Sequence, residues 1–268
     1  MELKSLLANR LIACFDIKHG RVTKACKFQN NIDISSPIEL ASRLYEEGID
    51  ELIFYDIMAS AENRPIDIEI VRQVASCVFV PFTVGGGIKT IEDMFNVLEA
   101  GAEKISVDSM AVRNPHILTQ GAEAFGTQCM VLSMQVKQVP ISDAIPSGYE
   151  IAIDGARVYT GIDAIEWAKQ GEDLGAGEIC VNSIDNDGTH QGYDLDITRR
   201  ISEKVSIPVI ASGGAGQPIH LKEMFQTTQA SAAIISSMLY SPRIKNYSVA
   251  ELKAYLMRED IAIRPLDH

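Results

Sequence analysis

The stretch VPFTVGGGIKTIEDMF (80–95) has a diverged second copy in the same chain, IPVIASGGAGQPIHLKEMF (207–225). In each copy a proline precedes an apolar run, which ends in consecutive glycines and leads into a segment with helical spacing. Pro81 of the first copy aligns with Pro208 of the second, an offset of 127 residues. A strand, turn and helix that recur within one chain indicate a fold built from repeated units.

The repetition extends beyond these two stretches. GIDELIF (48–54) resembles GAGEICV (175–181), and Glu51 aligns with Glu178 at the same offset of 127 residues. Each copy reads as a strand that begins with a charged residue. The two halves of the chain therefore share the same order of strand-like and helix-like segments.

The first strand of each half ends in a different polar residue. LIACFDIKHG (11–20) carries Asp16 where VLSMQVKQ (131–138) carries Gln135, at an offset of 119 residues. The change of offset has a visible source, because the second half contains an additional loop rich in turn-forming residues, PISDAIPSG (140–148).

Eight apolar runs alternate with amphipathic segments such as 36–48 and 90–101. The runs are LIACFDI (11–17), ELIFYDI (51–57), PFTVGG (81–86), KISVD (104–108), CMVLSMQV (129–136), EICVNSI (178–184), PVIASGG (208–214) and AAIISS (232–237). Continuous apolar runs are typical of parallel strands that are covered on both faces. The sequence therefore predicts one α/β domain over residues 1–268, a (βα)8 TIM barrel with half-barrel internal duplication. A doubly wound open sheet is the alternative.

Composition limits the classes of function. A net charge of −12 argues against a nucleic-acid surface, although backbone N–H groups can bind a phosphorylated substrate on an acidic protein. No apolar run approaches the roughly 18 residues of a membrane span, and the N-terminus lacks the layout of a secretory signal. The five cysteines lack CxxC spacing, and Cys14, Cys129 and Cys180 lie in apolar runs where we expect them in the core. We expect a cytoplasmic protein without a membrane or nucleic-acid partner.

The paired glycine turns suggest where a substrate binds. GGG at 85–87 and SGG at 212–214 follow strands, and glycine lets backbone N–H groups approach an anion closely. One strand later each half presents hydroxyl groups, Ser109 in the first and Ser236–Ser237 in the second. Plain tight turns would also use glycine. Two matching sites nevertheless favour a substrate with a phosphate at each end.

Carboxylates also lie at the expected strand ends. Asp16, between the apolar core and the mouth of a barrel, is placed to act as a general acid or base, although it could instead cap a loop. Lys24 in the following loop could be a cationic clamp or a solvated residue. Asp56 ends the second strand, and Asp187 lies in DNDG, which could be a simple turn or a substrate contact. The five histidines show no paired metal spacing, so we expect no metal site and no cofactor.

Several stretches together resemble the HisF family, the cyclase subunit of imidazole glycerol phosphate synthase. They are NRLIACFDIKHGRVTKACKF (9–28), GIDELIFYDIMAS (48–60), PFTVGGGI (81–88), GAGEICVNSIDNDGTHQGYD (175–194), PVIASGGAG (208–216) and ELKAYL (251–256). The resemblance implies a (βα)8 barrel and a lyase of histidine biosynthesis that forms a heterodimer. Ammonia from a glutaminase partner of the HisH type would convert a bis-phosphorylated aminoimidazole ribonucleotide (PRFAR) to imidazole glycerol phosphate and AICAR.

The resemblance also assigns residues. The first catalytic aspartate of the family falls on Asp16. Its substrate and phosphate-binding positions fall on Lys24, Gly87, Asp108, Ser109, Gly214, Ser236 and Ser237. At the same strand ends and turns we also expect substrate contacts from Asp56, Gly86, Asn182, Asp187, Gly188, Ser212 and Gly213. A charged ring that admits ammonia at the opposite end of the barrel falls on Arg10, Glu51, Lys104 and Glu178. Without the resemblance, four charges at strand starts would suggest only a modestly stabilising ring.

Two positions depart from the family pattern. Gln135 stands where the family has its second catalytic aspartate, and an amide cannot exchange a proton near neutral pH. Asp108 stands where the family has a phosphate-binding asparagine, and it could replace the missing acid. Because general acid–base catalysis contributes about 10²–10⁴-fold, we expect reduced activity unless another carboxylate substitutes. The alternatives are a HisF-like subunit that relays ammonia for amidation of a surface-sugar precursor, a scaffold without turnover, and an inactivating substitution that traps substrate.

Overall fold

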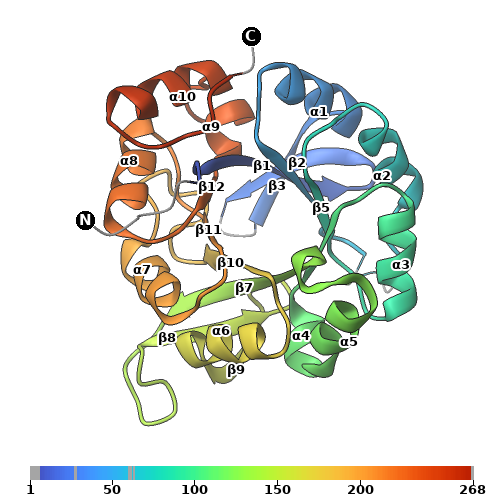
Figure 1. Cartoon of the computed structure of the whole chain (residues 1–268), viewed down its shortest axis with the longest axis vertical. Helices are drawn as coiled ribbons and strands as arrows, with labels where there is room; N and C mark the ends of the chain where they lie inside the picture. The colour runs from blue at the N-terminus through green and yellow to red at the C-terminus, as the bar shows by residue number, and fades with distance from the viewer. Residues whose placement is uncertain (1–6, 27–28, 60–61, 63, 267–268) are drawn as a thin grey trace.

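The computed structural model describes residues 7–26, 29–59, 62 and 64–266. Eight parallel strands form a closed ring in which each strand pairs with the next and the last pairs with the first (Figure 1). In ring order they are β1 (Arg10–Lys18), β4 (Glu51–Asp56), β5 (Phe82–Gly85), β6 (Lys104–Val107), β7 (Met130–Gln138), β10 (Glu178–Ser183), β11 (Val209–Ser212) and β12 (Ala232–Ile234). These are the eight predicted strands, so the (βα)8 barrel is confirmed and the open sheet is wrong.

Helices surround the strands on the outside of the ring (Figure 1). They are α1 (Pro37–Glu46), α2 (Ile68–Ala75), α3 (Ile91–Glu99), α4 (Ser109–Arg113), α5 (His116–Phe125), α6 (Ala164–Asp173), α7 (Leu195–Lys204), α8 (Pro218–Thr227), α9 (Ser236–Tyr240) and α10 (Val249–Arg258), with a 3₁₀ turn, η1 (Thr127–Cys129). Local sequence sets several of their starts. Thr90 and Asp93 form a capping box at α3, and proline occupies the first turn of α1 and α8.

Two antiparallel hairpins extend the barrel at equivalent places in the two halves. β2 (Arg21–Cys26) and β3 (Gln29–Ser35) follow β1, while β8 (Tyr149–Ile153) and β9 (Val158–Asp163) follow β7. The sequence led us to expect only loops there. β2, β3 and β9 escape prediction because polar residues interrupt them and most of β9 is exposed, so they lack the apolar run of a barrel strand.

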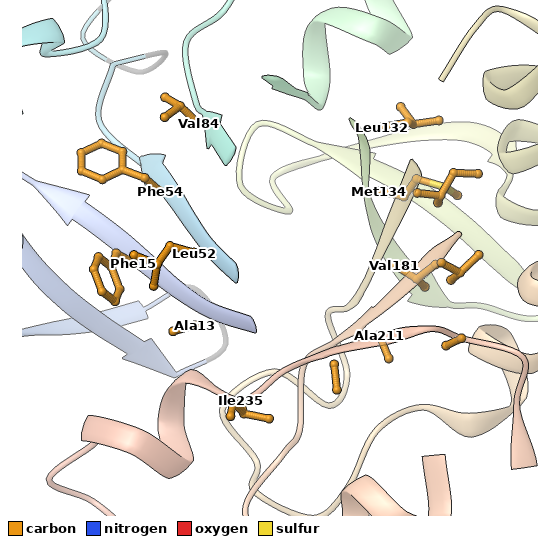
Figure 2. Packing of buried hydrophobic residues seen from close by; sticks show 14 of the residues in the cluster. Ala13, Phe15, Leu52, Phe54, Val84, Leu132, Met134, Val181, Ala211 and Ile235 are labelled. Atoms are coloured by element: carbon orange, nitrogen blue, oxygen red, sulfur yellow. The ribbon is translucent and has the colours of Figure 1, made fainter. Parts of the chain in front are cut away.

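Successive residues of the barrel strands face two different cores. Ala13, Phe15 and Leu52 point outward to the helices, as Figure 2 shows. Ile12 and Cys14 alternate with them and pack inside the ring with residues such as Cys180. This alternation decides which residues of each strand can reach the axis of the barrel.

Cysteine placement differs from expectation at one position. Cys14 and Cys180 are buried as predicted, but Cys129 lies in η1 and is only half-buried. A helical turn before β7 therefore replaces the strand start that the apolar sequence suggested. In the part of the chain that the structure describes, no helix is both long enough and apolar enough to cross a membrane.

Candidate functional site

The carboxyl ends of the barrel strands bring predicted site residues from both halves to one rim. Asp16 lies where β1 leaves the barrel to pair with β2, and Gln135 lies at the equivalent point between β7 and β8. β1 and β7 are four strands apart in either direction, so these two residues stand on opposite sides of the ring. Asn182 and Ser212 are aligned with Gln135 on the next two strands.

Asp108 and Gln135 form a direct contact at this rim. Gln135 Nε2 donates a hydrogen bond to Asp108 Oδ2, and Gln135 Oε1 accepts one from the backbone N–H of Ala156 at 2.6 Å. The second bond fixes the orientation of the amide, because a backbone N–H can bond only to the oxygen. Gln135 is buried, so its side chain is held from both ends.

The surroundings of Asp108 favour the protonated acid. The pKa of its carboxyl group is raised to about 7, chiefly by burial and in part by the nearby charge of Asp154, while hydrogen bonds from Gln135 and Ser109 and the charge of Arg113 lower it. Arg113 compensates little because it is ion-paired with Asp154. Asp108 is thus a carboxyl group that exchanges its proton near neutral pH.

The two glycine turns repeat the same close approach. A Cβ atom added to Gly86 would overlap the carbonyl oxygen of Asp56, and one added to Gly213 would be 2.8 Å from the carbonyl oxygen of Ser183. Each glycine has positive φ, 89° and 91° respectively. The partners, like the glycines, are 127 residues apart. Glycine is therefore required by both the backbone conformation and the lack of space.

The neighbouring glycines, Gly87 and Gly214, also have positive φ, 75° and 104°. A Cβ atom on Gly214 would overlap the carbonyl oxygen of Gly192, whose own N–H donates to Gly214 at 2.8 Å. The turn after β11 is thus packed against the loop that follows β10. That loop holds Asp187 and Gly188, whose segment forms consecutive turns with the Asp187 N–H bonded to Ser183 at 3.0 Å.

The predicted phosphate-binding serines begin two short helices, α4 and α9. Ser109 Oγ accepts a hydrogen bond from the N–H of Asp154 at 3.0 Å. Ser236 is buried and ties the start of α9 to strand β1, since its Oγ accepts from Cys14 N at 2.8 Å and donates to Cys14 O at 2.9 Å. Ser237, the next residue, also belongs to the first turn of α9. The structure thus gives Ser236 a structural contact in addition to its predicted role.

The structure gives Asp56 a protein partner. Its buried carboxylate accepts two hydrogen bonds from Arg64, at 2.7 and 2.9 Å, and others from the backbone N–H groups of Met58 and Ala59. These contacts favour a role in holding the loop after β4. Asn182 differs, because its buried Oδ1 has no hydrogen-bond partner among the described residues. Lys24 belongs to β2, but its side chain lies outside the described part of the structure.

At the opposite rim four charged side chains form a ring across the barrel. Arg10 donates to Glu51 and to Glu178, each at 2.5 Å, and Lys104 bonds to Glu178 at 2.9 Å and to Glu51 at 3.3 Å. Both carboxylates are about 5% exposed. Burial lowers the pKa of Arg10, but the charges of Glu178 and Glu51 outweigh this and raise it overall. Each carboxylate therefore touches two cations, and the ring closes this end.

Between the ring and the mouth, hydroxyl groups meet inside the barrel. Tyr55 Oη lies 3.0 Å from Ser106 Oγ and 3.4 Å from Ser133 Oγ. These two contacts join β4, β6 and β7 across the interior of the barrel. Burial raises the pKa of Tyr55, and the nearby Cys180 and Cys14 raise it further, so its phenol stays neutral. Small uncharged polar groups thus line part of the axis.

Comparison with known proteins fits this geometry. A family model for histidine biosynthesis proteins matches residues 10–245. An imidazole glycerol phosphate synthase subunit HisF from Desulfatibacillum aliphaticivorans is 56% identical over 259 residues, 97% of this chain and 98% of the relative. HisF subunits from Syntrophobacter fumaroxidans and Desulfosudis oleivorans are 54% and 52% identical, covering 97% of this chain and 99% of each relative.

The chain belongs to the HisF family. The resemblance found in the sequence is thereby confirmed. Membership does not test the role of any single side chain, so the site residues remain predictions that the geometry places at two opposite rims. Within this HisF protein, the ring and the mouth draw on residues from both halves of the barrel.

Sequence reasoning missed several partners of the site residues. Arg64 and Arg113 each pair with a carboxylate at the mouth, and Lys137 is ion-paired with Asp185. Ala156 holds the Gln135 amide from the β8–β9 turn. For the Lys137–Asp185 pair, the sequence signal was that strand β7 ends in polar residues. The others depend on loop conformations that one sequence does not specify.

Proposed function

We propose that this HisF-family chain is the cyclase subunit of an imidazole glycerol phosphate synthase. It would use ammonia to convert PRFAR to imidazole glycerol phosphate and AICAR. The observation that carries the proposal is the pairing of two rims on one barrel. A closed charged ring lies at the amino ends of the strands, and a mouth with acidic, amide and glycine-turn residues lies at the carboxyl ends.

Ammonia would enter through the ring formed by Arg10, Glu51, Lys104 and Glu178. Because every member of the ring is ion-paired, passage requires at least one ion pair to open. Beyond the ring, the neutral hydroxyl groups of Tyr55, Ser106 and Ser133 can exchange hydrogen bonds with a small neutral molecule. A neutral lining also avoids protonating ammonia before it reaches the mouth.

The substrate would span the mouth with one phosphate in each half of the barrel. Gly86, Gly87 and Ser109 would bind one phosphate through backbone and hydroxyl donors, with Asp108 alongside. The second phosphate would contact Ser212, Gly213, Gly214 and Ser237 close to Ser236. Four glycines with positive φ at matching positions support this arrangement, because this backbone conformation can direct consecutive N–H groups toward an anion. Lys24 of β2 and Asp187 of the loop after β10 would contact the substrate, with Gly188 shaping the turn. Asn182 Oδ1, which has no hydrogen-bond partner within the described part of the chain, offers an acceptor.

Asp16 would act as a general acid or base on one side of the mouth. Gln135 on the opposite side can donate and accept hydrogen bonds but cannot exchange a proton. Without another proton-transferring group the rate would fall by about 10²–10⁴-fold, the usual contribution of one such group. The activity of this chain therefore depends on whether a second carboxyl group at the mouth takes part.

The ammonia source would be a glutaminase subunit of the HisH type bound at the ring end of the barrel. The names of the HisF relatives, each a subunit of imidazole glycerol phosphate synthase, support a partner of this kind. Coverage of 97% of the chain by these relatives supports one cyclase domain over residues 1–268. Co-elution of the purified chain with such a glutaminase would test the partnership.

The function is tested by mixing the purified chain with PRFAR and ammonium salt and following AICAR release. We expect release whose rate rises with the concentration of free ammonia. Binding of PRFAR without AICAR release at any ammonium concentration would contradict the proposed activity. Binding without release would instead favour a scaffold or a subunit that relays ammonia to another enzyme.

A further inference from the structure

The mouth of the barrel contains an acid and an amide in contact, Asp108 at the end of β6 and Gln135 on β7. Gln135 stands on the strand opposite Asp16, where a second proton-transferring group would face it. The amide cannot serve, but its Nε2 touches a carboxyl group that can. Asp108, the group that can exchange a proton, therefore lies one strand away from Gln135, the repeat counterpart of Asp16.

We propose that Asp108 performs, in this chain, the proton transfers that Gln135 cannot make, and that Gln135 is the residue that positions Asp108. This inference rests on the function proposed above. Acid and amide have in effect exchanged places between two neighbouring strands. Asp108 would be a catalytic residue that touches substrate, while Gln135 acts through it.

The contacts with Gln135 and Ser109 orient the carboxyl group of Asp108. Its Oδ2 accepts the bond from Gln135, and Gln135 is itself fixed by the N–H of Ala156 at 2.6 Å. A carboxyl group held by such contacts can present its proton in a defined direction. Such positioning is what a general acid or base requires, because proton transfer needs hydrogen-bond distance and alignment.

Charged and neutral groups from several neighbouring elements influence the ionisation of Asp108. Asp154, in the β8–β9 turn, disfavours its ionised form, and Arg113 of α4 favours it. Gln135 and Ser109 are neutral donors that favour ionisation, while Cys180 of β10 is kept as the thiol because burial raises its pKa to about 12. Burial outweighs the favourable contacts, so protonated and ionised forms coexist near pH 7.

The proposed reaction conserves atoms and protons. PRFAR and ammonia give imidazole glycerol phosphate, AICAR and water. New C–N bonds form at the ammonia nitrogen, which loses protons, while the C–N bond to AICAR and the carbonyl C–O bond break. The departing nitrogen and oxygen gain protons. Asp108 would give its proton to the departing AICAR nitrogen and regain one from the ammonia-derived nitrogen, so that it ends as it began.

The test compares four proteins in the ammonium assay of AICAR release. They are the chain itself, Asp108→Asn, the double variant Asp108→Asn/Gln135→Asp, and a control, Asp143→Asn, which makes the same chemical change in an exposed loop. We expect Asp108→Asn to lower kcat at least about 100-fold without raising KM for PRFAR. The kcat of the double variant should return to within about tenfold of that of the parent chain, and the kcat of the control should equal that of the parent chain.

The pH profile provides a second readout. With rates expressed per free ammonia, kcat/KM of the parent chain should fall as pH rises above about 7, because the acid form of Asp108 is lost. This fall should be absent from the residual activity of Asp108→Asn. Gln135→Met removes a hydrogen bond that favours the carboxylate, so the fall should move to higher pH, an effect that lost packing alone would not produce.

The outcomes separate this inference from the proposed function. An active parent chain whose Asp108→Asn variant keeps its rate and pH profile would overturn the role of Asp108 and leave the cyclase assignment intact. An inactive parent with an active double variant would also overturn it, since Asp108 would then fail to replace the missing acid. No AICAR from any of the four proteins, with PRFAR bound, would instead defeat the proposed function.

Discussion

The carboxyl group of Asp108 accepts a hydrogen bond from the side-chain amide of Gln135, across the gap between strands β6 and β7. The contact places a proton-exchanging group beside one that cannot exchange a proton. Burial of the Asp108 carboxyl group gives it a measurable effect on stability as well as its proposed part in catalysis.

Asp108 should lower the stability of the folded chain as pH rises. The folded protein keeps the proton up to about pH 7, whereas the unfolded chain releases it near pH 4, so unfolding releases a proton between these values. The contribution of Asp108 to the free energy of unfolding therefore declines from about pH 4 to pH 7. The free energy of unfolding of Asp108→Asn, measured relative to that of the parent chain, should therefore increase by on the order of 1–3 kcal/mol when the pH is raised from 5 to 8. Urea unfolding at both pH values measures the difference, and equal gains at the two would contradict the raised pKa.

The charged ring should contribute more to stability than an exposed ion pair. Glu178→Gln removes one carboxylate and leaves Arg10 and Lys104 to share Glu51, which should cost about 1–3 kcal/mol in urea unfolding. Glu166→Gln is the control, because that carboxylate pairs with Lys204 on the surface and should change stability by less than about 1 kcal/mol.

The same Glu178→Gln variant should keep ammonium-driven AICAR release within about threefold of the parent, because the chemistry lies at the other rim and free ammonia in solution can also reach that mouth directly. A collapse of the rate in a stably folded variant would contradict this and show that ammonia from solution also depends on the intact ring.

The glycine turn after β5 should tolerate no side chain. Gly86→Ala places a Cβ against the carbonyl oxygen of Asp56 at a φ of 89°, and we expect a loss of at least about 2 kcal/mol. Gly161→Ala is the matched control, since Gly161 also has positive φ, 73°, but its added Cβ would have no heavy atom of the described residues within 4 Å apart from its own chain neighbours. It should cost only about 1 kcal/mol, the conformational part alone. Equal losses in the two variants would mean that the close approach to Asp56 has no energetic consequence.

A buried ion pair should hold the C-terminal helix α10 to the barrel. Lys253 Nζ lies 2.7 Å from Asp50 Oδ1, both side chains are about 3% exposed, and Asp50 Oδ2 accepts from Leu11 N at 2.8 Å. Lys253→Met would leave the carboxylate buried without its cation and should cost about 3–5 kcal/mol. The double variant Asp50→Asn/Lys253→Met should recover part of this loss, because the asparagine oxygen can still accept from Leu11. Failure of the second substitution to recover any stability would contradict an electrostatic origin.

The barrel could be predicted from sequence because each strand is a continuous apolar run and the two halves repeat. Pro81 and Pro208, or Glu51 and Glu178, fix the register of that repeat without structural information. The charged ring was foreseeable for the same reason, since its residues begin strands and so must lie at one rim. The structure adds that Arg10 and Lys104 each bond to both glutamates.

The mouth could be predicted only in outline. The sequence places Asp16, Asp108 and Gln135 at strand ends, but not which side chains touch. The Asp108–Gln135 contact depends on the β8–β9 turn, whose Ala156 N–H holds the amide, and the second strand of that hairpin, β9, lacks a continuous apolar run. The engagement of Asp56 by Arg64 likewise follows from the path of a loop.

The proposed cyclase must build ammonia nitrogen into the imidazole product. Incubation of the chain with PRFAR and ¹⁵N-ammonium, followed by mass spectrometry of both products, measures this directly. We predict one ¹⁵N in each imidazole glycerol phosphate molecule and none in AICAR. Label in AICAR, or an unlabelled imidazole product, would contradict the proposed cyclase.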